Sequence, residues 1–182
     1  MMISLKSKIT QKVLNYFFLN PEDKRYINEL AKILDLDPKN LFRKLEELEN
    51  EGLLGSEFRG KERFFFLNKS YSLLEHYCHI FLKTLGLEQE LREIINNTEG
   101  IKEAYIFGSY ARSKMDASSD IDILLIGNHS TLQVQKKINK LQKEVAREFN
   151  VISLSIKEFE KKKKQKNQFI ENILKSKPIK LL

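Results

Sequence analysis

Apolar residues in the first third of the chain recur at intervals of three and four, which is the spacing of one face of a helix. The pattern predicts three successive helices, with the bounds Ser7–Leu19, Tyr26–Leu34 and Pro38–Glu51. Asp37 and Pro38 supply an N-cap and a first-turn proline for the third helix. Gly52 is a suitable residue to end it. The segment is therefore expected to be a small helical domain.

Two strand-like runs, Leu53–Arg59 and Arg63–Leu67, follow, and the short turn between them is typical of a hairpin. Three helices and a basic hairpin resemble a winged helix-turn-helix domain. That resemblance implies that the third helix enters the major groove of double-stranded DNA and that the hairpin contacts phosphate. The residues it assigns to DNA binding are Lys39, Asn40, Arg43, Lys44, Arg59, Lys61 and Arg63. A protein-docking module with the same fold is the alternative.

Residues 70–98 carry continuous apolar faces and predict a helical connector. The stripe fits either a homodimer seam or packing onto a following domain. We therefore expect three segments: a DNA-binding domain at 1–69, the connector at 70–98, and a second domain at 99–182. The expected fold class is α+β with two domains.

The second domain concentrates the candidate chemistry. Ile101–Phe107 reads as a strand that runs directly into Gly108 and Ser109, and Asp120 and Asp122 lead into an apolar strand. Period-two geometry places the two carboxylates on one face, about 6–7 Å apart along the strand. Carboxylates this close repel each other unless a cation lies between them, and Mg²⁺ favours such oxygen ligands. Glycine permits a tight turn, while serine offers donors to phosphate oxygens.

Gly108-Ser109, ten further residues, and Asp120-Ile121-Asp122 together resemble the minimal nucleotidyltransferase branch of the DNA polymerase beta superfamily. The resemblance covers residues 88–182 and implies a mixed β-sheet flanked by helices. It implies that Asp120 and Asp122 are catalytic and hold Mg²⁺. It also implies that Gly108, Ser109 and Arg112 bind a nucleoside triphosphate, with ATP the expected substrate.

The chain departs from that family's pattern at two positions. The third metal-binding carboxylate of the family comes from the next strand, where this chain has Asn150. An amide oxygen can bind a metal, but it brings no charge and cannot act as a general base. Ser113 replaces the usual glycine of the loop, which causes strain if its φ is positive.

Two functions follow from these features. The first is Mg²⁺-dependent transfer of a nucleotidyl group from the triphosphate to a hydroxyl of a protein or an RNA. The minimal branch includes antitoxins that modify a partner RNase, so a helical RNase toxin is one acceptor the resemblance implies. The alternative is a transcriptional regulator whose transferase-like domain senses nucleotide with little catalysis.

Charge distribution adds one feature to this picture. Residues 100–182 hold 17 basic against 9 acidic residues, within a chain of net charge +7. Lys161–Lys164 and Lys166 form the densest run, which fits either a solvated helix face or a guide for a polyanionic substrate. No apolar run approaches the ~20 residues of a membrane span. With one cysteine, Cys78, we expect a cytoplasmic protein without membrane partners.

Overall fold

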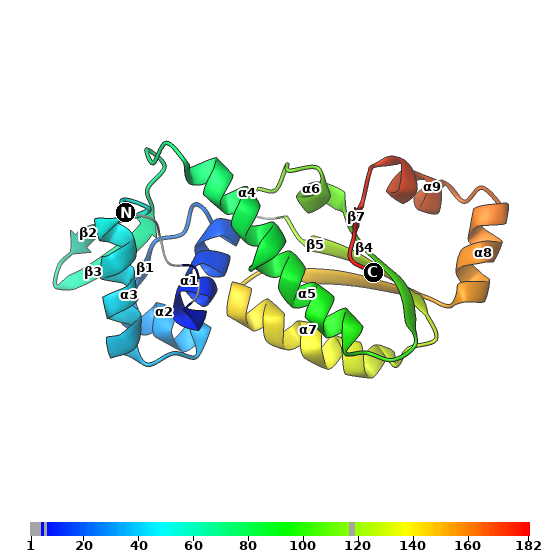
Figure 1. The fold of residues 1–182 in the computed structure, drawn as a ribbon, viewed down its shortest axis with the longest axis horizontal. Coiled ribbons are helices and arrows are strands. Elements are labelled where there is room, and N and C mark those ends of the chain that lie inside the picture. Colours follow the sequence, from blue (N-terminus) through cyan, green and yellow to red (C-terminus); the bar gives the residue numbers. More distant parts are fainter. Residues whose placement is uncertain (1–4, 6, 117–118) are drawn as a thin grey trace. The chain divides into compact units, whose positions relative to one another are not determined.

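The computed structural model describes residues 5, 7–116 and 119–182 (Figure 1). The chain divides into two compact units, and each is considered separately. The N-terminal unit comprises Met1–Gln89 with Lys143–Ala146, and the C-terminal unit comprises Glu90–Gln142 with Arg147–Leu182. No helix within the described part of the chain is both long and apolar enough to cross a membrane.

The N-terminal unit contains the three expected helices and the hairpin, together with one strand that the sequence did not predict. In chain order its elements are α1 (Lys8–Leu19), β1 (Arg25–Tyr26), α2 (Ile27–Leu34), α3 (Pro38–Asn50), β2 (Leu54–Arg59), β3 (Glu62–Leu67) and α4 (Leu74–Thr84). Side-chain caps set the starts of two helices. Ser7 Oγ accepts from Thr10 N–H at 3.5 Å, and Asp37 Oδ1 accepts from Asn40 N–H at 2.9 Å.

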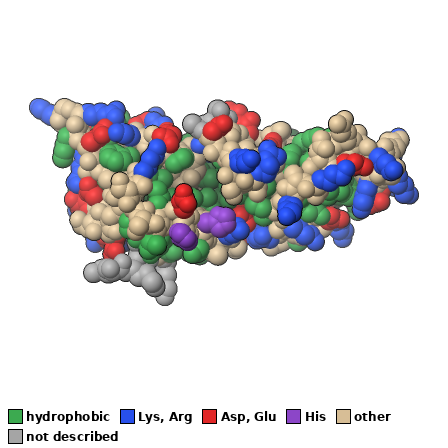
Figure 2. All heavy atoms as spheres, turned by 90° about the horizontal axis from the view of Figure 1, so that it is seen from above, with side chains coloured by type: hydrophobic (Ala, Val, Ile, Leu, Met, Phe, Trp, Pro, Cys, Tyr) green, Lys and Arg blue, Asp and Glu red, His purple; other side chains and the backbone are tan. Residues whose placement is uncertain are grey.

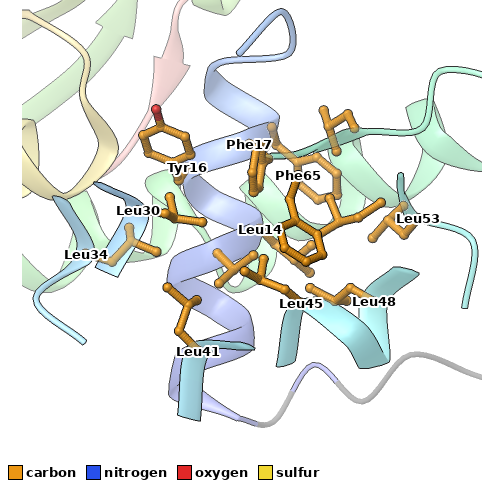
Figure 3. Close-up of a cluster of buried hydrophobic side chains, with 14 of the residues drawn as sticks. Leu14, Tyr16, Phe17, Leu30, Leu34, Leu41, Leu45, Leu48, Leu53 and Phe65 are labelled. Carbon is orange, nitrogen blue, oxygen red and sulfur yellow. The ribbon is translucent and has the colours of Figure 1, made fainter. Parts of the chain in front are cut away.

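The hairpin forms a small antiparallel sheet with the unpredicted strand, in the order β1-β3-β2. Side chains from all three helices meet its inner face. Leu14, Phe17, Leu30, Leu41 and Phe65 are fully buried in this core (Figure 3). The apolar periodicity read from the sequence matches the buried face of α3, whereas α1 is buried on all sides from Val13 to Leu19.

The C-terminal unit is built around a four-stranded sheet. Its elements are α5 (Leu87–Asn96), β4 (Ile101–Phe107), α6 (Gly108–Ala111), β5 (Ile121–Gly127), α7 (Thr131–Val145), β6 (Phe149–Leu154), α8 (Ile156–Lys164), α9 (Gln168–Lys175) and β7 (Ile179–Lys180). The strand order is β6-β5-β4-β7. β5 and β6 are parallel, whereas the other pairs are antiparallel, so the predicted mixed sheet flanked by helices is confirmed.

Alternation along the strands divides the side chains between two faces of this sheet. On one face, Leu124 and Ile126 of β5 form a cluster with Phe159 of α8 and with Ile170 and Ile173 of α9. The opposite face presents the alternate residues of the strands, and α5 and α7 lie along it (Figure 1). The chain after β6 forms two helices, α8 and α9, because Lys166 adopts a φ of 50° between them.

Candidate active site

The backbone at Gly108 supports the carboxylate of Asp122. β4 ends at Phe107, which pairs in register with Asp122 of β5, and α6 begins at the next residue. Gly108 has a φ of +73°, and a Cβ placed there would lie 2.0 Å from Asp122 Oδ2. No other residue type leaves room for the carboxylate at this position. The expected tight turn is therefore present, in the form of a single helical turn.

Asp120 and Asp122 lie on either side of the fully buried Ile121. Asp122 is the second residue of β5, whereas Asp120 directly precedes the strand and is exposed. The strand was expected to begin after Asp122. It begins earlier, because Ile121 N–H donates to Glu148 O at 2.9 Å and so joins the sheet. Neither carboxylate forms an ion pair with any residue in the described part of the chain.

Asn150 is the direct neighbour of Asp122 across the parallel pair of β5 and β6. Its Nδ2 donates a hydrogen bond to Asp122 Oδ1 at 3.1 Å. The amide thus acts as a hydrogen-bond donor to the carboxylate and supplies no negative charge of its own.

Arg147 holds the loop that leads to the two aspartates, a role that sequence reasoning did not assign. Its side chain is buried, with 7% of the residue exposed. Nη1 donates to the carbonyl oxygens of Asp116 at 3.1 Å and Ser119 at 3.4 Å. The available signal was its position three residues before Asn150, just before the strand that supplies the family's third carboxylate. Ala117 and Ser118, within the ten-residue spacer of the motif, lie outside the described residues.

The other loop residues differ in exposure. Ser109 is half-buried within α6, and its carbonyl oxygen accepts from Lys114 N–H at 3.0 Å. Arg112 is exposed and forms no ion pair with the residues that the structure describes. Ser113 has a φ of 54°, so the position where the family has glycine is left-handed in this chain.

An aromatic pair lies on the same sheet face as Asp122. Phe107 contacts Phe169 of α9 edge to face, with ring centroids 6.1 Å apart, and Phe169 is 44% exposed. Tyr105, two residues before Phe107, donates its hydroxyl hydrogen bond to Glu103. Burial, reinforced by that bond, raises the pKa of Tyr105 to about 12, so the phenol stays neutral at physiological pH.

The donor set fits Mg²⁺ in its chemistry. Mg²⁺ is commonly held by one or two carboxylates, with water and substrate phosphates completing its shell. Asp120 and Asp122 provide two hard oxygen donors, and Asp122 already lies against the loop backbone. Among the described residues, no cluster of three or more histidine, cysteine, aspartate or glutamate side chains is present. A metal bound here would therefore depend on substrate oxygens for much of its coordination.

The seven DNA-binding candidates fall into two groups in the N-terminal unit. Lys39, Asn40 and Arg43 are exposed on α3, and Lys61 is exposed at the hairpin tip. The other three are held by carboxylates: Lys44 pairs with Glu47 at 2.5 Å, Arg59 pairs with Glu57 at 2.6 Å, and Arg63 pairs with Glu49 and with Glu46.

Arg63 is the most constrained of these side chains. Its Nε donates to Ser56 Oγ at 2.9 Å, and its guanidinium lies 5.0 Å from the ring centroid of Phe65. Together with the bonds to Glu46 and Glu49, these contacts tie the hairpin to α3. Its evident role in the structure is to join these two elements.

Comparison with known proteins identifies the family of the C-terminal part of the chain. A family model described as the nucleotidyltransferase domain matches residues 88–180, which is more than half of the chain. The chain belongs to this nucleotidyltransferase domain family. Among solved structures, it is similar to a mutant of the toxin–antitoxin MntA–HpeT, at 14% identity and a TM-score of 0.39. That match covers 52% of this chain and 72% of the other. No curated protein matches the chain.

Proposed function

We propose that the protein transfers a nucleotidyl group from a nucleoside triphosphate, with ATP the expected donor, to a hydroxyl of a protein or an RNA. The observation that carries this proposal is the Asp122 carboxylate resting on the Gly108 backbone, with Asp120 two residues away. This contact supports the proposal, because it brings the turn at Gly108 and Ser109, which would bind phosphate, next to the aspartates that would hold the metal.

In the proposed reaction, the acceptor oxygen forms a bond with the α-phosphorus of the triphosphate. The bond between that phosphorus and the oxygen bridging to the β-phosphate breaks, and pyrophosphate leaves with the electron pair. The hydroxyl proton passes to solvent. Bound Mg²⁺ would neutralise phosphate charge and acidify the attacking hydroxyl.

The chain's own residues bind and orient the triphosphate. Asp120 and Asp122 would hold Mg²⁺, and Asn150 can join them only if its amide turns its oxygen toward the ion. Ser109 offers its hydroxyl and backbone N–H to phosphate oxygens, and Arg112 is available to a further phosphate. Arg147 positions the loop from which Asp120 extends.

One observation favours a second candidate function. Asn150 donates to Asp122 where the family has a third carboxylate, so no residue at this position can accept the acceptor's proton. A domain that binds nucleotide with little turnover would serve a regulator whose N-terminal unit binds double-stranded DNA. Lys39, Asn40, Arg43 and Lys61 would then make the DNA contacts, because they are exposed.

The test of transfer needs no knowledge of the acceptor. Purified protein, Mg²⁺ and α-³²P-labelled triphosphates are incubated with lysate, beside an Asp120→Ala/Asp122→Ala variant. Label that appears on a macromolecule only with the unaltered protein supports transfer, and a helical RNase is the first protein acceptor to examine. Absence of label, with Mg²⁺-dependent nucleotide binding intact, would favour the regulator.

A further inference from the structure

α8 presents a row of exposed lysines that pair with no carboxylate of the described residues. Lys157, Lys161 and Lys164 follow one another at intervals of four and three, so they share one exposed face of the helix, here termed the lysine ridge. Within the described residues, none of these three side chains forms an ion pair or a hydrogen bond. Lysines elsewhere do, as in the pairs Lys24–Glu57 and Lys175–Glu171.

The acidic residues of α8 do not offset this charge. Glu158 is committed to the helix cap, because Ser155 donates both its N–H and its hydroxyl to the Glu158 carboxylate, at 2.8 and 2.7 Å. These bonds keep the pKa of Glu158 below its ordinary value. Glu160 is the one other acidic residue of the helix, against five lysines. Four of those lysines are consecutive at its last turn.

The helix is held firmly in place beneath the ridge. The capping box fixes its start, and Phe159, which is 5% exposed, packs against Leu124 and Ile126 of β5 and against α9. On the helical wheel, the lysine ridge lies opposite Phe159. The charged row therefore projects from a fixed base, and Figure 2 shows Lys and Arg side chains gathered over the end of the C-terminal unit that carries α8 and α9.

The same sheet face leads from α8 to the active site. Ile126, which lies in the same buried cluster as Phe159, is four residues beyond Asp122 in β5, or about 13 Å along the strand. Phe169 of α9 is 44% exposed, and its ring contacts that of Phe107 edge to face. Phe107 is the register partner of Asp122. An exposed aromatic ring thus lies between the cationic helix and the carboxylates.

Cations that follow a phosphate backbone, combined with an exposed aromatic ring for stacking, form the usual binding surface for single-stranded nucleic acid. We propose that the lysine ridge and Phe169 bind a single-stranded RNA whose terminal hydroxyl is the acceptor of the transferase. This inference rests on the proposed function for the acceptor role, but RNA binding itself can be measured without nucleotide or Mg²⁺.

The primary experiment measures binding of a fluorescein-labelled single-stranded RNA of twelve nucleotides to the full chain by anisotropy. The ridge variant is Lys157→Gln/Lys161→Gln/Lys164→Gln. Its matched control on α7 is Lys136→Gln/Lys140→Gln/Lys143→Gln, which removes three exposed lysines with identical spacing. Circular dichroism melts establish that all proteins are folded.

We expect the ridge variant to bind RNA at least about tenfold more weakly than the unaltered protein. The slope of log Kd against log salt should fall by about 2, since each lost phosphate contact contributes about 0.7 for single strands. The α7 variant should change Kd by less than about twofold, because it leaves the ridge contacts intact. Equal weakening by both variants would mean diffuse attraction, and an unaffected ridge variant would remove α8 from the interface; either result overturns the proposal.

A second substitution tests the ring separately from the charge. Phe169→Leu keeps an apolar side chain against Phe107 but removes the stacking surface. We expect about fivefold weaker RNA binding with an unchanged salt slope. Unchanged affinity would remove Phe169 from the proposed surface.

Failure of this inference and failure of the proposed function give different results. The Asp120→Asn/Asp122→Asn variant should bind RNA at least as tightly as the unaltered protein, because it removes two negative charges, even though it transfers no label. Label found on a protein, and unaffected by ribonuclease or by the ridge substitutions, would leave the transferase intact and overturn the RNA acceptor. Preferential binding of an acidic peptide such as polyglutamate over RNA would assign the ridge to a protein partner instead.

Discussion

In the N-terminal unit, Arg25 bonds to Asp23 and Glu29, and Arg63 bonds to Glu46 and Glu49. In the C-terminal unit, Asp120, Asp122 and the lysine ridge form no ion pair with the described residues. The ion pairs with Glu29, Glu46 and Glu49 join residues of strands to residues of helices. In the C-terminal unit, these side chains have no ion-pair partner among the described residues, so their charges remain available to a ligand of opposite charge.

Two glycines, one in each unit, differ in the same way, and substitution of Gly108 has the largest expected effect on activity. Gly108 and Gly60 both have positive φ, but a Cβ at Gly60 meets nothing within 4 Å, while one at Gly108 meets the Asp122 carboxylate. We expect Gly108→Ala to lower transfer by about a hundredfold, because it displaces the Asp122 carboxylate, which we propose holds the metal. Gly60→Ala should cost only about 1 kcal/mol of unfolding free energy. Label transfer measures the activity and urea unfolding measures the free energy of unfolding. Equal transfer by the Gly108→Ala and Gly60→Ala variants would contradict the proposed role of Gly108 in the site.

Asn150 stands in the candidate active site where an added charge can be tested directly. Asn150→Asp places a second carboxylate directly beside Asp122. With Mg²⁺ we expect turnover to rise about tenfold, since an added metal ligand strengthens transition-state charge stabilisation. In EDTA the midpoint of thermal unfolding should fall by about 2 °C through like-charge repulsion. Asn150→Ser is the uncharged control, and identical behaviour of the two variants would mean that this strand does not contribute to metal binding.

Within one hairpin, Arg63 is held by ion pairs with α3, whereas Lys61 is exposed at the tip. Arg63→Ala should lower the unfolding free energy by about 1–2 kcal/mol, because it removes bonds to Glu46, Glu49 and Ser56. Lys61→Ala should leave stability unchanged and reduce the salt slope of double-stranded DNA binding by about 1. Urea unfolding and anisotropy report these quantities. A Lys61→Ala protein with an unaltered DNA salt slope would speak against the hairpin as a DNA contact.

The smallest effect concerns two left-handed residues, one in each unit. Ser113 has a φ of 54° and Asp35 has a φ of 51°. Aspartate tolerates this conformation better than most residue types, so glycine relieves less strain there. Ser113→Gly should raise the unfolding free energy by about 1 kcal/mol, and Asp35→Gly by less than about 0.5 kcal/mol. The reverse ranking in urea unfolding would show that the Ser113 loop is not strained.

Local pattern predicted most of the fold, and tertiary contacts account for what it missed. The strand Ile101–Phe107 and the start of α3 at Pro38 were predicted because their signals are contiguous. β1 has two residues, too few for any periodicity, and it exists only because β3 offers a partner. The break between α8 and α9 depends on the backbone at Lys166, a lysine that carries no turn signal.

The candidate site was predictable in its residues but not in its contacts. The motif brought out Gly108, Ser109 and both aspartates, because glycine and paired carboxylates have few other uses at that spacing. Sequence could not show that Arg63 faces glutamates, since its partners come from α3 and lie 14 and 17 positions away. Nor could it show that Asn150 turns its donor, rather than its oxygen, toward Asp122.

Calorimetric titration of the full chain with a non-hydrolysable ATP analogue, with and without Mg²⁺, tests the central claim that Asp120 and Asp122 form a metal-dependent nucleotide site. We predict saturable binding by the unaltered protein that requires Mg²⁺ and is lost in Asp120→Asn/Asp122→Asn, while Gly60→Ala binds normally. Binding that persists without Mg²⁺, or that the double substitution leaves unchanged, would contradict the account.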